Sequence, residues 1–201
     1  MADSGFTIWF TGLSGSGKTT LAERVREVLL GRGLAVEWLD SSKIRREMNR
    51  DLGFTRSDIE ANLRRIAYEC RLLNRNGVIA IVSAISPYRD VRDRIRVDLV
   101  RFMEVYCRCP LETLVLRDEH DLYARAERGE IQNVAGMNAP YEEPLKPEVA
   151  VETDRETPEA CVARIVRTAE ILGYLTPVAP SGYTPEQEET IKRRLRDLGY
   201  M

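Results

Sequence analysis

Residues 6–20 constrain the fold of this chain more than any other stretch. Residues 6–10, FTIWF, favour a β-strand and lead into GLSGSGKT at positions 12–19. This octapeptide matches the pattern G-x-x-x-x-G-K-[ST] in full, and apolar residues then recur at helical spacing over positions 21–29. A strand, a glycine-rich turn and a helix in this order predict a P-loop, whose backbone N–H groups surround phosphate oxygens.

The rest of the chain alternates between strand and helix patterns. Residues 78–82 are apolar throughout, which is typical of a strand buried on both faces of a parallel sheet. Three further strands are predicted, at residues 35–39, 102–109 and 149–151. Helices are predicted at residues 55–77, 89–100, 111–117, 158–173 and 185–199. This alternation predicts an α/β fold of the P-loop NTPase type, a three-layer sandwich in which helices cover both faces of a parallel sheet.

The sequence divides into two parts of unequal length. Residues 1–175 are predicted to form one P-loop domain, within which residues 119–147 are polar and interrupted by glycine and proline. A segment of this kind inside a compact domain is usually a functional lid or a disordered loop, and we predict a lid. Residues 176–201 are predicted to be a linker followed by a charged C-terminal helix. The sequence leaves open whether that helix docks on the domain, docks on a partner subunit or stays loose.

Composition excludes several classes of protein. The chain has 201 residues with a net charge of -2, so it lacks the basic excess of a nucleic-acid-binding protein. No apolar run approaches the roughly 18 residues that a membrane span needs, and the first residues lack a signal-peptide pattern. The four cysteines and the one histidine show no zinc spacing. We therefore expect a cytoplasmic protein without nucleic-acid or membrane partners.

The glycine-rich loop supplies the predicted nucleotide contacts. Lys18 is expected to reach the β- and γ-phosphates of ATP, and Thr19 to hold Mg²⁺ through its hydroxyl. The residues predicted to bind the nucleotide are Gly12, Ser14, Gly15, Ser16, Gly17, Lys18, Thr19 and Thr20. ATP and Mg²⁺ are thus the expected cofactors.

Asp40 is the carboxylate expected nearest to the γ-phosphate. The strand at residues 78–82 is not followed by an acid, whereas Asp40 follows the strand at residues 35–39. Ligands of open α/β sheets bind at such carboxyl ends, so Asp40 is predicted as a second metal ligand or as a base; its alternative role is a helix N-cap.

Arginines of the predicted lid region complete the catalytic set. Arg117 is predicted to be catalytic, together with Lys18 and Asp40. Arg125 and Arg128 are further candidates for stabilising the transferred phosphoryl group. Their alternative role is a solvated charged surface. No N-K-x-D motif of GTPases occurs, and the small size favours a small-molecule kinase.

Several stretches resemble the adenylylsulfate kinase family. They are GLSGSGKTT, LDSSKIRREMNRDLGF, ISPYRDVRDRIR and RAERGEIQNVAGMNAPYEEP, and the resemblance runs from about residue 6 to residue 173. It implies transfer of a phosphoryl group from MgATP to the 3′-hydroxyl of adenosine 5′-phosphosulfate (APS), and it implies a homodimer. The alternatives are the same chemistry on another anionic acceptor and a nucleotide-binding module without turnover.

The resemblance also implies an acceptor site. Arg45 would contact the phosphosulfate end of APS, and Phe54 would stack on its base, although plain core packing is the alternative for Phe54. The remaining residues implied to bind the acceptor are Asn49, Asn62, Ile85, Ser86 and Pro87. Because direct in-line transfer needs no covalent step, we expect Ser86 to line the site without being phosphorylated.

This chain departs from the family pattern on the acceptor side. The family has an acid, an arginine and two phenylalanines at the positions of Ser42, Ile59, Ala84 and Val134, and Asp-Pro-Lys-Gly at Asp118-Glu119-His120-Asp121. Losing one charge-assisted hydrogen bond and one base–aromatic stack would weaken APS binding by roughly 2.5–6 kcal/mol if the two losses were additive. The sequence therefore leaves the identity of the acceptor open.

Overall fold

Five parallel strands form a sheet in the computed structural model, which describes residues 5–118, 121–177 and 185–200. The strand order across the sheet is β2-β3-β1-β4-β5. The bounds are Thr7–Thr11 for β1, Val36–Asp40 for β2, Ile79–Ser83 for β3, Phe102–Arg108 for β4 and Val149–Glu152 for β5. The predicted parallel sheet is confirmed, with every predicted strand in place.

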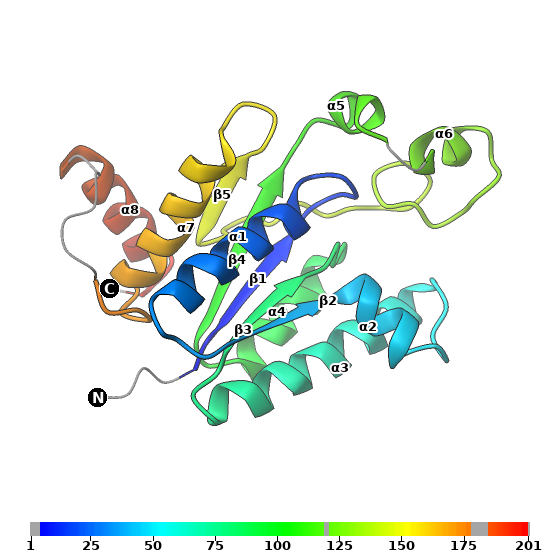
Figure 1. Ribbon diagram of the computed structural model, residues 1–201. Coiled ribbons are helices and arrows are strands. Elements are labelled where there is room, and N and C mark those ends of the chain that lie inside the picture. Colours follow the sequence, from blue (N-terminus) through cyan, green and yellow to red (C-terminus); the bar gives the residue numbers. More distant parts are fainter. Residues whose placement is uncertain (1–4, 119–120, 178–184, 201) are drawn as a thin grey trace.

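Helices cover both faces of this sheet (Figure 1). α1 and α7 pack on one face, and α3 and α4 pack on the other. The bounds of the helices are Lys18–Gly31 for α1, Ser41–Glu47 for α2, Arg56–Arg75 for α3, Arg89–Asp98 for α4, Leu111–Leu116 for α5, Leu122–Glu127 for α6, Pro158–Ile171 for α7 and Pro185–Asp197 for α8. The three-layer α/β sandwich is therefore confirmed.

The alternation of side chains along the strands explains the two cores. In β1, Ile8 and Phe10 pack under α1 and α7, whereas Trp9 packs against α3 and α4. All five residues of β1 and all five of β3 are buried. Both strands lie inside the sheet, so neither face of them meets water, which is why their sequences lack a polar alternation.

Two short helices, α2 and α6, were not predicted from the sequence. α2 begins directly after β2, and the Asp40 carboxylate caps it by accepting hydrogen bonds from the backbone N–H groups of Ser42 and Lys43. α6 lies in the predicted lid, where the Asp118 carboxylate accepts from the N–H groups at its start. Local caps made by side chains just outside each helix stabilise these short elements.

The C-terminal helix α8 docks on the domain. Its Leu195 side chain is fully buried, and Tyr200 just beyond it donates a hydrogen bond to Glu148, which directly precedes β5. The structure thus decides a placement that the sequence left open. Within the described ranges no helix is both long enough and apolar enough for a membrane crossing.

We expect Val82→Ala to lower the free energy of unfolding by about 2 kcal/mol, because the fully buried side chain in β3 would leave a cavity. The matched control is Val97→Ala, since the Val97 side chain on α4 is 82% exposed. The control should change stability by less than about 0.5 kcal/mol. Urea unfolding measures both, and equal losses would contradict the burial of β3.

Candidate active site

The carboxyl ends of three neighbouring strands meet at one edge of the sheet. Asp40 at the end of β2 pairs in register with Ser83 at the end of β3, and Phe10 of β1 pairs with the same Ser83. β1 then continues into the glycine loop, residues 12–19. This edge is where open α/β sheets bind ligands, so the candidate site is built here.

Close packing fixes the shape of the glycine loop. Gly12 has a φ of +149°, and a Cβ there would lie 2.5 Å from the Cys107 carbonyl oxygen of β4 and 2.6 Å from Ser16 Oγ. Gly15 and Gly17 have φ values of +72° and +82°, in the left-handed region that L-residues avoid. Any side chain at Gly12 would therefore push the loop away from β4.

The loop offers groups suited to a phosphate. Ser16 Oγ is buried without a hydrogen-bond partner among the described residues, which suits an acceptor oxygen supplied by a ligand. Thr19 and Thr20, at the start of α1, are exposed. The positive end of the α1 dipole points at the same place. A phosphate chain therefore fits the cradle that the glycine loop and α1 make.

Lys18 is held inside this loop. Its Nζ donates a hydrogen bond of 2.5 Å to the Leu13 carbonyl oxygen. Burial lowers the pKa of Lys18 from 10.5 to about 8, although the charges of Cys107 and Asp40 act in the opposite direction.

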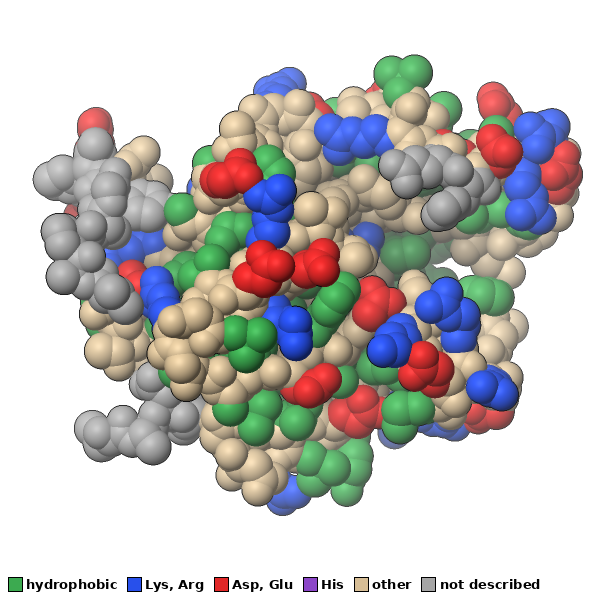
Figure 2. All heavy atoms as spheres, in the orientation of Figure 1, with side chains coloured by type: hydrophobic (Ala, Val, Ile, Leu, Met, Phe, Trp, Pro, Cys, Tyr) green, Lys and Arg blue, Asp and Glu red, His purple; other side chains and the backbone are tan. Residues whose placement is uncertain are grey.

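An open cleft of about 1060 Å³ lies beside the loop. Its floor is made by residues of the glycine loop and α1, and its other wall by residues of α5 and α6 together with Arg117 and Asp118. Figure 2 shows the surface hollowed between the part that carries α5 and α6 and the part that carries α2 and α3. Tyr123 of α6 donates a 2.7 Å hydrogen bond to the Ser14 carbonyl, which ties this wall to the loop.

The three candidate arginines occupy different places. Arg117 lines the cleft, and its Nη2 donates to the Thr153 carbonyl at 3.1 Å. Arg125 also lines the cleft. Arg128 forms an exposed ion pair with Glu130 and is not among the residues that line the cleft.

Asp40 makes the contacts of a helix N-cap, which was the alternative role predicted for it. Oδ1 accepts from the N–H groups of Ser42 and Lys43, and Oδ2 accepts from Ser83 Oγ at 2.8 Å. A carboxylate oxygen has more than one lone pair, so these bonds orient the group and still leave it room for a metal ion. The ring N–H of Trp38 donates to Ser83 Oγ and fixes that hydroxyl in turn.

The predicted acceptor residues on α2 and the following loop are a half-buried arginine and an exposed aromatic ring. The Arg45 guanidinium donates to the Gly53 carbonyl and lies 4.9 Å from the centroid of the Phe54 ring. Phe54 is 62% exposed and Ile85 is 36% exposed, so core packing explains neither side chain. An exposed aromatic ring beside a guanidinium is a suitable platform for a planar anionic ligand.

Asn49, in the loop after α2, and Asn62 of α3 form a buried bridge. Asn49 Nδ2 donates to Asn62 Oδ1 at 2.9 Å, and Asn62 Nδ2 donates to Ser41 Oγ at 3.0 Å. Arg65 donates to Asn49 Oδ1 at 2.9 Å. Both amides are nearly fully buried, and these contacts fix α2 against α3.

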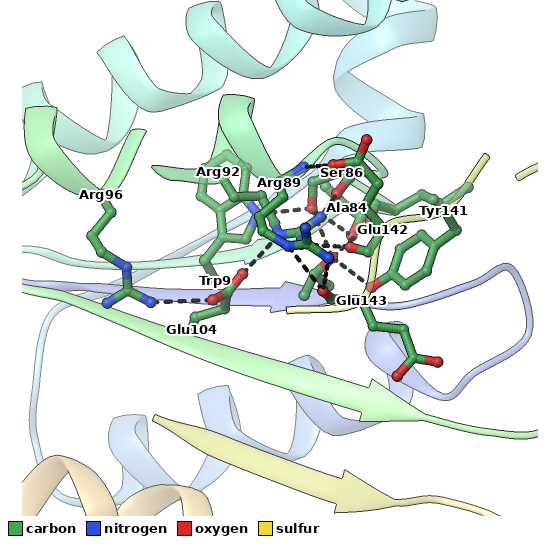
Figure 3. A network of polar contacts seen from close by, with 12 residues as sticks. Trp9, Ala84, Ser86, Arg89, Arg92, Arg96, Glu104, Tyr141, Glu142 and Glu143 are labelled. Atoms are coloured by element: carbon green, nitrogen blue, oxygen red, sulfur yellow. Dashed lines mark hydrogen bonds and ion pairs between the residues drawn. The ribbon is translucent and has the colours of Figure 1, made fainter. Parts of the chain in front are cut away.

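The acceptor loop, residues 85–87, is held by groups that the sequence analysis missed (Figure 3). Ser86 has a φ of +42° and is buried. Its Oγ accepts from Trp9 Nε1 at 3.1 Å and donates to Thr11 Oγ1 at 3.0 Å. Arg92 of α4 donates to the Ser86 carbonyl at 2.5 Å. No motif signals these partners, because they come together only through packing between distant elements.

The positions that depart from the family pattern lie in varied surroundings. Ile59 packs partly buried against the core under α3 and α4, and Ala84 is buried in that core. Val134 is buried in a cluster with Leu114 and Tyr123 in the wall of the cleft. The N–H of Ser42 donates to Asp40. His120 lies outside the described residues.

Comparisons with known proteins point to one family. A family model described as adenylylsulphate kinase matches residues 4–152. An adenylyl-sulfate kinase from Rippkaea orientalis is 47% identical over 180 residues, covering 89% of this chain and 99% of the relative. A probable adenylyl-sulfate kinase from Pyrococcus abyssi is 48% identical over 171 residues, covering 85% and 98%. The solved structure of Mycobacterium tuberculosis APS kinase in complex with AMPPNP and APS has a TM-score of 0.79 at 36% identity, covering 83% of this chain and 98% of that one.

The lowered pKa of Lys18 predicts a pH-dependent stability for the ligand-free protein. At pH 7 the side chain is charged in both the folded and the unfolded state, and burying that charge lowers stability. Above about pH 8 the folded state loses the proton, while the unfolded state keeps it up to 10.5, so this penalty is relieved as the pH rises. Lys18→Met should therefore raise stability at pH 7, by up to about 3 kcal/mol, and by much less near pH 10.

Urea unfolding of the parent protein and of Lys18→Met from pH 7 to pH 10 measures the difference in their free energies of unfolding. A gain that is constant across that range would contradict a lowered pKa at Lys18.

Proposed function

The chain belongs to the adenylylsulphate kinase family, and on this premise we propose that it transfers the γ-phosphoryl group of ATP to the 3′-hydroxyl of APS. The observation that carries the proposal is the position of Asp40. Its carboxylate caps α2, the helix that bears Arg45, and accepts a hydrogen bond from Ser83, whose register partner Phe10 belongs to the strand that leads into the glycine loop. One carboxylate thus lies between the candidate donor and acceptor sites.

The donor side follows from the glycine loop. Its N–H groups and Ser16 Oγ would bind the phosphates, and Lys18 would contact the β- and γ-phosphates after leaving the Leu13 carbonyl. Thr19 and Asp40 would hold Mg²⁺, which keeps several waters and takes few protein ligands. When bound, the ion would neutralise charge on the phosphates. Arg117 and Arg125 reach the same cleft from its other wall.

The transfer itself is an in-line displacement. The 3′-oxygen of the acceptor forms a bond to the γ-phosphorus while the bond to the bridging oxygen breaks, and that electron pair leaves with ADP. The transition state is loose, so positioning matters more than a strong base, and Asp40 would take the hydroxyl proton only as the alternative to holding Mg²⁺. Ser86 is buried, and its hydroxyl accepts from Trp9 and donates to Thr11, which supports a structural role without phosphorylation.

The acceptor side uses the exposed platform of Arg45 and Phe54. The guanidinium would bind the phosphosulfate group, and the ring would stack on the adenine. Ile85 and Pro87 would line the site, while Asn49 and Asn62 would support it by fixing α2.

A second candidate is the same transfer to another nucleotide-linked or sugar-linked anion. It is favoured by Val134 and Ile59, whose side chains pack into apolar clusters and offer neither an aromatic ring nor a charge to an acceptor.

We also propose a division into domains, a cellular location and an oligomeric state. Residues 1–175 form the kinase domain, with residues 119–147 as its lid, and residues 176–201 are an appendage. The four cysteines are all free and buried, which suits the reducing cytoplasm. A homodimer without nucleic-acid partners is the assembly expected from the family.

We expect ADP release from ATP to depend on added APS, with a KM for APS in the micromolar range. A coupled assay measures it against a panel of other nucleotide-linked and sugar-linked anions. Lys18→Ala should abolish the release with every acceptor, because the phosphate contact is lost. A lower KM for another compound of the panel than for APS would favour the second candidate, in which that compound is the acceptor. ATP binding without any acceptor-dependent release would leave a non-catalytic nucleotide-binding module.

Phe54→Ala should raise the KM for APS by about 5- to 150-fold, because a base–aromatic stack contributes about 1–3 kcal/mol. The KM for ATP should stay the same. Met48→Ala is the control, since Met48 is a similarly exposed side chain nearby in sequence, at 65% exposure. An unchanged KM for APS in Phe54→Ala would remove this ring from the acceptor site.

A further inference from the structure

A chain of ionic contacts runs from the C-terminal helix to the acceptor loop. Figure 3 shows its inner part, where Arg92 and Arg96 of α4 reach Glu104 of β4. These charged groups are not part of the proposed transfer chemistry, yet Arg92 is 2% exposed and Glu104 is 6% exposed. Charges buried so deeply need a stated reason, because taking them out of water is costly.

The outer end of the chain is Tyr200, just beyond the end of α8 at Asp197. Tyr200 donates a 2.7 Å hydrogen bond to Glu148 Oε1, and Arg96 Nη1 donates to the Tyr200 hydroxyl at 3.0 Å. Leu195 of α8 is fully buried and holds the helix on the domain. The family match ends at residue 152, so this end of the chain of contacts lies outside it.

The middle of the chain is the Glu148 carboxylate, which has no exposed surface. It accepts from the Glu104 backbone N–H at 2.6 Å and from both terminal nitrogens of Arg96. Arg96 also contacts the Glu104 carboxylate at 3.1 Å. Arg96 therefore joins Glu148, which directly precedes the edge strand β5, to Glu104 on the neighbouring strand β4.

The inner end is Arg92, whose guanidinium has three partners. Nε lies 2.8 Å from Glu104 Oε1, Nη1 donates to the Ser86 carbonyl at 2.5 Å, and Nη2 donates to the Glu142 carbonyl at 2.6 Å. The planar fork of arginine is the side chain that can hold three such partners in fixed directions. The contact with Glu104 is an ion pair without hydrogen-bond geometry, whereas the two Nη groups orient the two carbonyls through hydrogen bonds.

The acceptor loop needs this support because Ser86 has a φ of +42°. A non-glycine residue keeps a positive φ only where its surroundings hold it there. Ser86 is held at its hydroxyl by Trp9 and Thr11 and at its carbonyl by Arg92. Ile85, the exposed neighbour in the acceptor site, takes its position from this residue.

We propose that α8 is coupled to the acceptor site through Tyr200, Glu148, Arg96, Glu104 and Arg92, and that Arg92 is a positioning residue for the acceptor loop. The inference rests on the proposed function, because it assigns the coupling to acceptor binding. A contiguous set of packed and ionic contacts is the physical route by which one such site can affect another. A network that only stabilised the fold would leave acceptor binding unchanged.

Steady-state kinetics of the full chain with APS and ATP test the coupling. Tyr200→Phe removes one hydroxyl at the outer end, and Arg92→Lys keeps the charge but cannot hold three partners. We expect the KM for APS to rise by about 3-fold in Tyr200→Phe and by about 10-fold in Arg92→Lys, with the KM for ATP within about 2-fold of the parent. In the double variant the rise should be smaller than the product of the two, since both act through the same contacts.

Arg193→Ala is the matched control, because Arg193 is an exposed residue of α8. It should leave both KM values unchanged. The coupling would be overturned by an unchanged KM for APS in Tyr200→Phe or by an equal change of that KM in the control. It would also be overturned if the fold-change of the KM in the double variant equalled the product of the two single fold-changes.

The Trp9 indole N–H gives a readout that needs no turnover. It donates to Ser86 Oγ, and the chain has only two tryptophans, so Trp38→Phe assigns its NMR signal. We expect this signal to shift in Tyr200→Phe and to stay in place in Arg193→Ala. If the parent does not turn over APS, the proposed function fails, while a shifted indole signal still supports the coupling and an unshifted one overturns it.

Discussion

The close approach of the glycine loop to β4 is the contact on which the rest of the site depends. Gly12 packs against the Cys107 carbonyl so tightly that a Cβ would lie 2.5 Å from it. The loop is therefore pressed onto the ends of the strands, and α1 begins over the sheet with its N–H groups directed at the cleft. The same packing buries Lys18, whose ammonium group then bonds to the Leu13 carbonyl and loses proton affinity.

Strand register brings the acceptor side to the same edge. Because Asp40 pairs with Ser83, the end of β2 and the start of α2 lie next to the end of β3 and the acceptor loop. Asp40 is a cap and a candidate metal ligand at once, and the two roles are compatible. The capping bonds hold its carboxylate in one orientation, and a preoriented group loses little freedom when it acts in catalysis.

The buried arginines and glutamates between α4, β4 and β5 need explanation by something other than stability. A buried ion pair is often no more stabilising than well-packed apolar residues, because desolvation offsets the attraction. This network instead fixes the orientation of backbone groups. Arg92 holds carbonyls of the acceptor loop and of the segment around Glu142, which are far apart in the sequence. Apolar side chains would fill the same space without fixing those backbone groups.

The sequence by itself determined the parallel α/β sheet, the glycine loop with Lys18 and Thr19, and Asp40 at the end of β2, because these depend on local pattern and on strand order. It missed α2 and α6, although a helix N-cap was the alternative role predicted for Asp40; the cap that Asp118 makes for α6 was not predicted. Only the tertiary structure decided that Phe54 stands exposed beside Arg45, that Asn49 bridges to Asn62, and that α8 docks through Tyr200 beside Glu148. These contacts join residues from different elements, and their geometry is set by packing that no local spacing records.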